Sequence, residues 1–174
     1  NSNMITEPLA LTALRTIYKY LPRVYENLNR LDLREKILYA STVSGIAFTQ
    51  TGLGGIHAIA HPIGVYANIP HGLACALVTL PVLEYNLEIL SKEKLSALGR
   101  ALGVYSLRGA KNKIIKKIEE FFSLLGIKLG LRNYGIKWNI LPILAQEAPK
   151  TGSYKTNPRA LNYEVVLDIL KKAF

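Results

Sequence analysis

The sequence predicts an all-α fold, and three observations support this prediction. Apolar residues recur at helical spacing over most of the 174 residues, and no segment alternates for long in the manner of a strand. Hydrophobic residues make up 49% of the chain, enough to fill a core without disulfides or structural zinc. Residues 101–105 come closest to a strand, but glycine interrupts them, and no internal repeat is visible. We therefore expect one helical-bundle domain over residues 1–174.

The expected helices in the first third of the chain start at capping residues. Thr6 is expected to cap the first helix, with Pro8 in its first turn. Pro22 is expected to kink or split that helix, because proline removes a backbone donor. Asp32 is expected to cap a second helix over residues 33–48, which a glycine-rich segment then ends.

Further helices follow from amphipathic runs later in the chain. One apolar run opens at His71 and ends near Asn86, and a short amphipathic helix follows Ser91. Residues 108–125 form a longer amphipathic helix that closes at a glycine. Asn162 is expected to cap a terminal helix that ends at residue 174. A short helix is expected over 141–148, between loops over 130–138 and 149–159.

Charge and cysteine content limit the classes of partner. The net charge is +10, and residues 108–137 hold eight Lys or Arg and two Glu among apolar residues at helical spacing. We interpret this stretch as a solvated helix face and expect no nucleic-acid partner, since that alternative rests on charge alone. Cys75 is the single cysteine, so no intramolecular disulfide can form, and the chain opens on polar residues without a signal-peptide pattern. We expect a cytoplasmic protein.

One long segment carries no charge. Residues 37–83 contain no Asp, Glu, Lys or Arg, and all three histidines of the chain, His57, His61 and His71, fall inside it. Glycines, prolines and polar side chains interrupt every apolar window long enough to cross a membrane, so we expect no membrane partner. The segment is therefore expected to be buried in a core, with the histidines in the interior or at its edge.

Two interpretations of the histidines stay open on residue type alone. A buried histidine must hydrogen-bond its ring nitrogens, bind a metal or stay neutral at a cost. A lone one is most often a satisfied core residue, but three within fifteen positions make a metal or catalytic cluster an equal alternative. His57 and His61 are four apart, the spacing of a zinc pair on one helix face. Pro62 disfavours a helical His61, so the two rings are expected to diverge.

The same segment carries a recognisable signature. Residues 52–64 read GLGGIHAIAHPIG and residues 69–74 read IPHGLA. These two motifs closely resemble the signature of iron-containing (group III) alcohol dehydrogenases. The resemblance extends over nearly the whole chain, and the other segments that carry it are residues 3–11, 45–48, 80–81, 84–86, 151–152 and 157–159.

The resemblance implies a fold and a set of roles. The fold would be the helical domain of the dehydroquinate synthase-like, iron-containing alcohol dehydrogenase type. His57 and His71 match two ligands of a divalent ion, Fe(II) or Zn(II), and His61 matches a catalytic non-ligand histidine that relays a proton. The positions that match the family's substrate cleft are Phe48, Gly52, Gly54 and Gly55. If His57 and His71 share an ion, their nearest ring nitrogens should lie within ~6 Å even without metal.

The departures from the family pattern define the expected activity and partners. Nothing in the chain resembles the family's N-terminal α/β domain, which holds NAD(P), and the other two metal ligands, an Asp and a His, are expected before residue 1. The chain alone is thus expected to be inactive and to bind metal weakly. The expected partners are a small alcohol or aldehyde and a separate nucleotide-binding domain or subunit, and a homodimer is also allowed. The alternative is a stand-alone helical binding module derived from the family.

Overall fold

The computed structural model describes residues 2–174, and every regular element in them is helical. The all-α prediction is confirmed, and no strand occurs among these residues. The described chain forms two compact units, each built from two separate stretches of sequence. The prediction of one domain over residues 1–174 stays a prediction. Within the described part of the chain, no helix is both long and apolar enough to cross a membrane.

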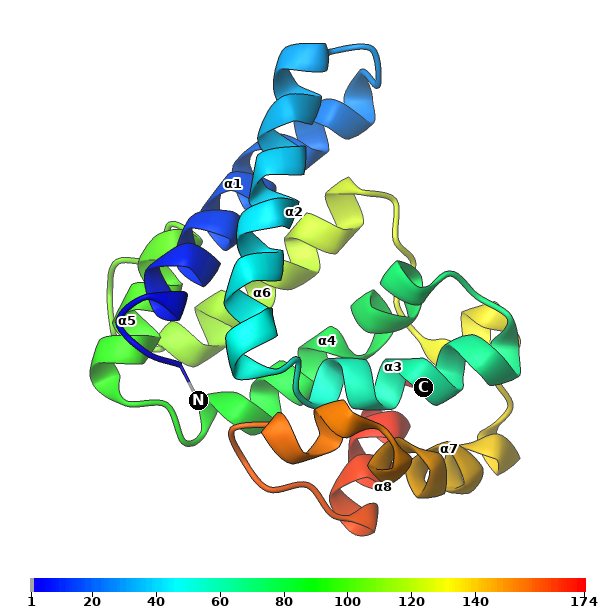
Figure 1. Cartoon of the computed structure of the whole chain (residues 1–174). Coiled ribbons are helices and arrows are strands. Elements are labelled where there is room, and N and C mark those ends of the chain that lie inside the picture. Colours follow the sequence, from blue (N-terminus) through cyan, green and yellow to red (C-terminus); the bar gives the residue numbers. More distant parts are fainter. Residues whose placement is uncertain (1) are drawn as a thin grey trace. The chain divides into compact units, whose positions relative to one another are not determined.

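The first unit contains residues through Gly52 together with Leu90–Leu125. Its helices are α1 (Thr6–Glu26), α2 (Leu31–Thr51), α5 (Lys92–Ala101) and α6 (Ala110–Leu124). Figure 1 shows α1 and α2 as an antiparallel hairpin, with buried Ala13, Ala40 and Val43 between them. These small side chains let the two helix backbones approach closely over their length.

Both capping expectations for the hairpin are wrong, and Pro22 does not split its helix. Thr6 is the first helical residue rather than the cap, and the side-chain oxygen of Asn3 accepts hydrogen bonds from the backbone N–H groups of Ile5 and Thr6. Pro22 lies inside α1 without splitting it, since the helix runs on to Glu26. Asp32 also lies inside its helix and forms an ion pair of 2.8 Å with Arg30 instead of a cap.

The outward face of α2 contradicts the expectation that the whole charge-free segment is buried. Leu38, Tyr39 and Ile46 are 69%, 56% and 54% exposed. Only the opposite side of α2 is buried, through residues such as Ala40 and Ala47. Large apolar residues lie on both sides of this helix, so lack of charge alone did not indicate which side packs.

The solvated-face interpretation of α6 is confirmed. Ile114, Ile118 and two phenylalanines of this helix are buried, while Lys113 and Lys116 are exposed. The Ser91 side chain caps α5 by accepting a hydrogen bond from the Lys94 backbone N–H at 3.3 Å. Both helices therefore occur where the amphipathic pattern of the sequence predicted them.

The second unit contains residues Leu53–Ile89 and Gly126–Phe174. Its α-helices are α3 (Gly55–Ala67), α4 (His71–Leu87), α7 (Leu141–Glu147) and α8 (Tyr163–Lys172). The loops expected over 130–138 and 149–159 contain short 3-10 turns, η1 (Leu131–Tyr134), η3 (Ala148–Lys150) and η4 (Gly152–Thr156), and η2 (Trp138–Ile140) precedes α7. The predicted cap of α8 is confirmed, because the Asn162 side chain accepts from the Val165 backbone N–H at 2.8 Å.

The core of this unit fixes α3 and α4 against each other. Ile59, Ala60 and Ile63 of α3 are fully buried, as are Ala74 and Val78 of α4, and all five belong to one apolar cluster. The two helices therefore present fixed positions for the side chains at their other faces.

Pro62 does not end α3, contrary to the expectation that it would disfavour a helical His61. The ring of Pro62 is buried, and α3 continues to Ala67. Burial of an apolar ring in the core favours the helical conformation here, and this gain offsets the lost backbone hydrogen bond. His57 and His61 accordingly lie one turn apart on the same helix.

Candidate metal centre

The start of each histidine-bearing helix positions its rings. Gly54 precedes α3 with a φ of 85°, a conformation that favours glycine, and His57 lies in the first turn after it. Pro70 precedes α4, and His71 is the first residue of that helix. Because α3 and α4 pack together, residues separated by fourteen positions in sequence meet in space.

His57 and His71 are neighbours. Their ring centroids are 5.2 Å apart with an interplanar angle of 48°. One possible ligand atom from each of His57, His71 and Cys75 lies within 4.8 Å of the other two. The separation is inside the ~6 Å limit expected of two co-ligands without metal.

His61 belongs to the same group of rings. Its centroid is 5.2 Å from that of His71, and the two rings meet edge to face at 77°. His61 is exposed, as is His71, while His57 is half-buried. The three rings thus form one cluster at the edge of the core, as the sequence indicated, although a proton-relay role for His61 stays a prediction.

Cys75 is a member of the cluster that the sequence interpretation missed. It follows His71 by one helical turn, and its Sγ lies 3.5 Å from His71 Nε2. The signal was present in the sequence, since residues four apart on an expected helix share a face. The group therefore offers two imidazole nitrogens and one sulfur, a donor set that fits a divalent ion of the zinc or cobalt type.

Burial shifts the pKa of two groups in the cluster, His57 and Cys75. Burial lowers the pKa of His57 below its ordinary value of 6.5, and the neighbouring His71 and His61 lower it further. His57 is consequently neutral at pH 7, the form that binds metal. Burial also raises the pKa of the Cys75 thiol to about 11.

The residues matched to the family's cleft fall into both units. Phe48 and Gly52 end α2 in the first unit, where the Gly52 backbone N–H donates to the Phe48 carbonyl at 2.8 Å. Gly54 and Gly55 open α3 in the second unit. That these four positions line one substrate cleft stays a prediction.

A loop near the C-terminus holds the start of α3. The Asn157 side-chain oxygen accepts from the Gly55 N–H at 3.0 Å, and its amide pairs reciprocally with that of Asn86 in two bonds of 2.9 Å. The Gly54 N–H donates to Thr156 Oγ1 at 3.2 Å. A Cβ on Gly55 would lie 2.9 Å from the Asn157 oxygen, so glycine is needed there. This loop fixes the helix end nearest His57, and sequence reasoning identified it only as a segment of resemblance.

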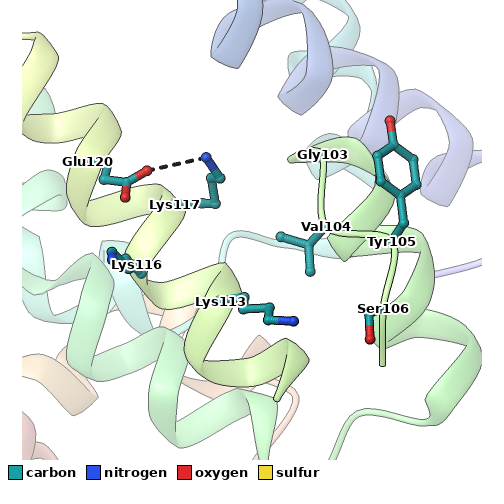
Figure 2. Close-up of a pocket in the computed structure, with 8 residues that line it drawn as sticks. All are labelled: Gly103, Val104, Tyr105, Ser106, Lys113, Lys116, Lys117 and Glu120. Atoms are coloured by element: carbon teal, nitrogen blue, oxygen red, sulfur yellow. Dashed lines mark hydrogen bonds and ion pairs between the residues drawn. The ribbon is translucent and has the colours of Figure 1, made fainter. Parts of the chain in front are cut away.

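The first unit has a hollow of different character. Figure 2 shows Lys113, Lys116 and Lys117 of α6 beside residues 103–106, around a cavity of about 380 Å³. Lys117 forms an ion pair of 3.3 Å with Glu120. None of the predicted site residues lines this hollow, so it is distinct from the histidine cluster.

Taken with the fold, the cluster defines a helical domain with histidine donors for a metal ion. Residues 1–174 match the C-terminal model of the Fe-containing alcohol dehydrogenase family, and the chain belongs to this family. It is 33% identical to the 1,3-propanediol dehydrogenase of Klebsiella pneumoniae over 178 residues, which cover 100% of this chain and 46% of that protein. It is 30% identical to the NAD-dependent methanol dehydrogenase of Bacillus methanolicus, covering 97% of this chain and 45% of that protein.

Solved structures agree with this assignment. The crystal structure of a 1,3-propanediol oxidoreductase superposes with a TM-score of 0.93 at 33% identity, over 99% of this chain and 46% of that one. An alcohol dehydrogenase from Oenococcus oeni gives a TM-score of 0.93 at 31% identity, again over 99% and 46%. The chain thus spans about 46% of the length of the relatives that it matches.

Proposed function

We propose that this chain provides the metal-binding and substrate-side part of an NAD(P)-dependent alcohol or aldehyde oxidoreductase. The observation that supports the proposal most directly is the meeting of His57 and His71, whose ligand atoms lie within 4.8 Å. Family membership implies a metal, and the relative in Bacillus methanolicus is named as NAD-dependent. The substrate class, a small alcohol or aldehyde, follows from the relatives' names alone.

In this proposal His57 and His71 hold a divalent ion, Fe(II) or Zn(II), through neutral ring nitrogens. When bound, such an ion supplies a Lewis acid that stabilises alkoxide character on the substrate oxygen while hydride passes to or from the nicotinamide. His61 is exposed beside His71 and can carry a proton between the substrate hydroxyl and solvent. Gly54 and Gly55, which open the helix that carries His57, would lie near the substrate, while the matching of Phe48 and Gly52 to the same cleft rests on the family resemblance.

In this proposal NAD(P) is bound by a separate nucleotide-binding domain or subunit. The described residues contain no strand, and hence no strand–turn–helix phosphate site of the dinucleotide-binding type. Hydride transfer requires substrate and nicotinamide in van der Waals contact. The chain alone should therefore show no NAD(P)H oxidation above blank with short aldehydes.

The test combines metal binding with this activity assay. Fe(II) and Zn(II) titrations under anaerobic conditions should show one site in the unmodified chain, and His57→Ala or His71→Ala should abolish it. His61→Ala is the matched control, because it removes a ring from the same cluster without removing a proposed ligand. Equal metal binding by all four proteins would overturn the ligand assignment, whereas no metal binding by any of them would favour the stand-alone binding module. Robust turnover by the chain alone would overturn the need for a separate nucleotide-binding part.

A further inference from the structure

Helix α4 presents a thiol one turn after His71, beside the histidine pair. Cys75 and His71 are four residues apart on one helix, so both side chains leave the same face. Cys75 is half-buried, and its sulfur is 3.5 Å from His71 Nε2. His57 reaches the same point from α3, and the three ligand atoms lie within 4.8 Å of one another.

One of the distances already matches an edge of a coordination tetrahedron. With Zn–N of ~2.05 Å, Zn–S of ~2.3 Å and tetrahedral angles, nitrogen and sulfur ligands should lie ~3.5 Å apart. The Cys75–His71 edge already has this length, at 3.5 Å. The remaining edges are at most 4.8 Å, so they would have to shorten when an ion binds.

We propose that Cys75 is a third protein ligand, so that this chain by itself forms a site of two histidines and one thiolate for Zn(II) or Co(II). The proposal rests on the proposed function for the position of the ion at His57 and His71. It extends that function by adding a soft donor, which favours zinc and cobalt over harder ions.

Metal binding by Cys75 releases one proton. A metal–sulfur bond forms, the S–H bond of Cys75 breaks, and the thiol proton passes to solvent or buffer. The histidines donate ring lone pairs and release no proton when they are neutral. Binding should thus release one proton more in the unmodified chain than in a variant without the thiol.

The competing interpretation is a local hydrogen bond in which the Cys75 thiol donates to His71 Nε2. In that case sulfur plays no part in metal binding, and only the two histidines would contact an ion. The two interpretations differ in whether sulfur becomes a metal ligand, and Co(II) reports this directly through a sulfur-to-metal charge-transfer band in the near ultraviolet.

The experiment uses the full chain, reduced and free of oxygen, titrated with CoCl2 and then with ZnCl2. The unmodified protein should develop the charge-transfer band at one equivalent. Cys75→Ser should lose the band and bind Zn(II) at least about tenfold more weakly, since even indirect supports of a ligand are worth about 10–100-fold in affinity. Cys75→Ala repeats the test without a hydroxyl, and His61→Asn, which keeps Cys75 and both ligands, should retain the band.

Calorimetry in two buffers of different ionisation enthalpy counts the protons, and circular dichroism checks that each variant is folded. Co(II) binding that needs His57 and His71 but gives no band, with equal affinity in Cys75→Ser, would overturn the role of Cys75 and leave the proposed function intact. Binding that is unaffected by His57→Ala or His71→Ala, or no binding at all, would overturn both.

Discussion

Replacing Asn157 by alanine should lower the free energy of unfolding of the second unit far more than replacing an ordinary surface asparagine would. The Asn157 side chain makes four hydrogen bonds: it accepts from the Gly55 N–H and from the Asn86 amide, and donates to the Asn86 oxygen and to the Arg159 carbonyl. Three of these four bonds lie between 2.9 and 3.0 Å, and the fourth is 2.6 Å. Alanine removes all of them.

The magnitude follows from the number of bonds and their exposure. At about 0.5–1.5 kcal/mol each, four bonds are worth about 2–6 kcal/mol. Asn157 is only half-buried, so water replaces part of the loss, and we expect about 3 kcal/mol. For a chain of this length, that lowers Tm by roughly 6–12 °C.

Urea unfolding followed by circular dichroism, together with calorimetry, measures the effect. Asn133→Ala is the matched control, because the Asn133 side chain donates one bond of 2.6 Å, to the Leu129 carbonyl. This variant should lose about 1 kcal/mol or less of its free energy of unfolding. Asn157→Asp keeps the acceptor for Gly55 but loses both donors, so it should fall between the two alanine variants. A loss in Asn157→Ala that is no larger than in Asn133→Ala would refute the reasoning.

Three further predictions concern α3 and the metal cluster. Gly55→Ala should cost about 1–3 kcal/mol in urea unfolding because its Cβ would meet the Asn157 oxygen at 2.9 Å. In Gly64→Ala of the same helix the added Cβ meets only Ile69 O, at 3.5 Å, so this variant should be neutral or more stable by up to about 1 kcal/mol. Equal effects of the two substitutions would contradict the close contact between Gly55 and Asn157. Alkylation of Cys75 by iodoacetamide at pH 8 should be more than about tenfold slower in the metal-free native chain than in urea, since a pKa of about 11 in place of 9.0 lowers the thiolate fraction about a hundredfold. The lowered pKa of His57 means that below pH 6.5 the unfolded chain binds a proton that the native chain does not. The associated stability is present above pH 6.5 and is lost as the pH falls through the lowered native pKa, and His57→Gln should flatten this part of the stability profile.

Short sequence patterns correctly predicted the elements that are stabilised by interactions within a few residues. The Asn162 cap and the amphipathic α6 were correct because a capping side chain and an apolar stripe act within a few residues. The Asp32 cap was wrong for an equally local reason, since Arg30 offers that carboxylate an ion pair instead. The Pro62 expectation failed because packing of the proline ring in the core outweighs a backbone preference.

The site was predictable only in part. A charge-free segment with three histidines indicated a cluster, and the family resemblance selected His57 and His71 from it. Cys75 was missed because the interpretation considered histidines alone. The pairing of Asn86 with Asn157 joins residues 71 positions apart, and no local pattern encodes such a contact.

Apolar packing, rather than metal binding, supplies the folding free energy of the second unit, so metal should complete the site without folding the chain. Small zinc domains are unfolded without metal because the ion supplies most of their folding free energy. Here Ile59 and Ile63 behind the α3 histidines and Val78 of α4 are fully buried, so apolar packing holds both helices before any ion arrives. The donor atoms, at most 4.8 Å apart, need to approach only to ~3.5 Å to share an ion. Metal should therefore raise the Tm of the chain while leaving its far-ultraviolet circular dichroism unchanged, whereas a gain of helix signal on adding metal would show that the cluster is not preformed.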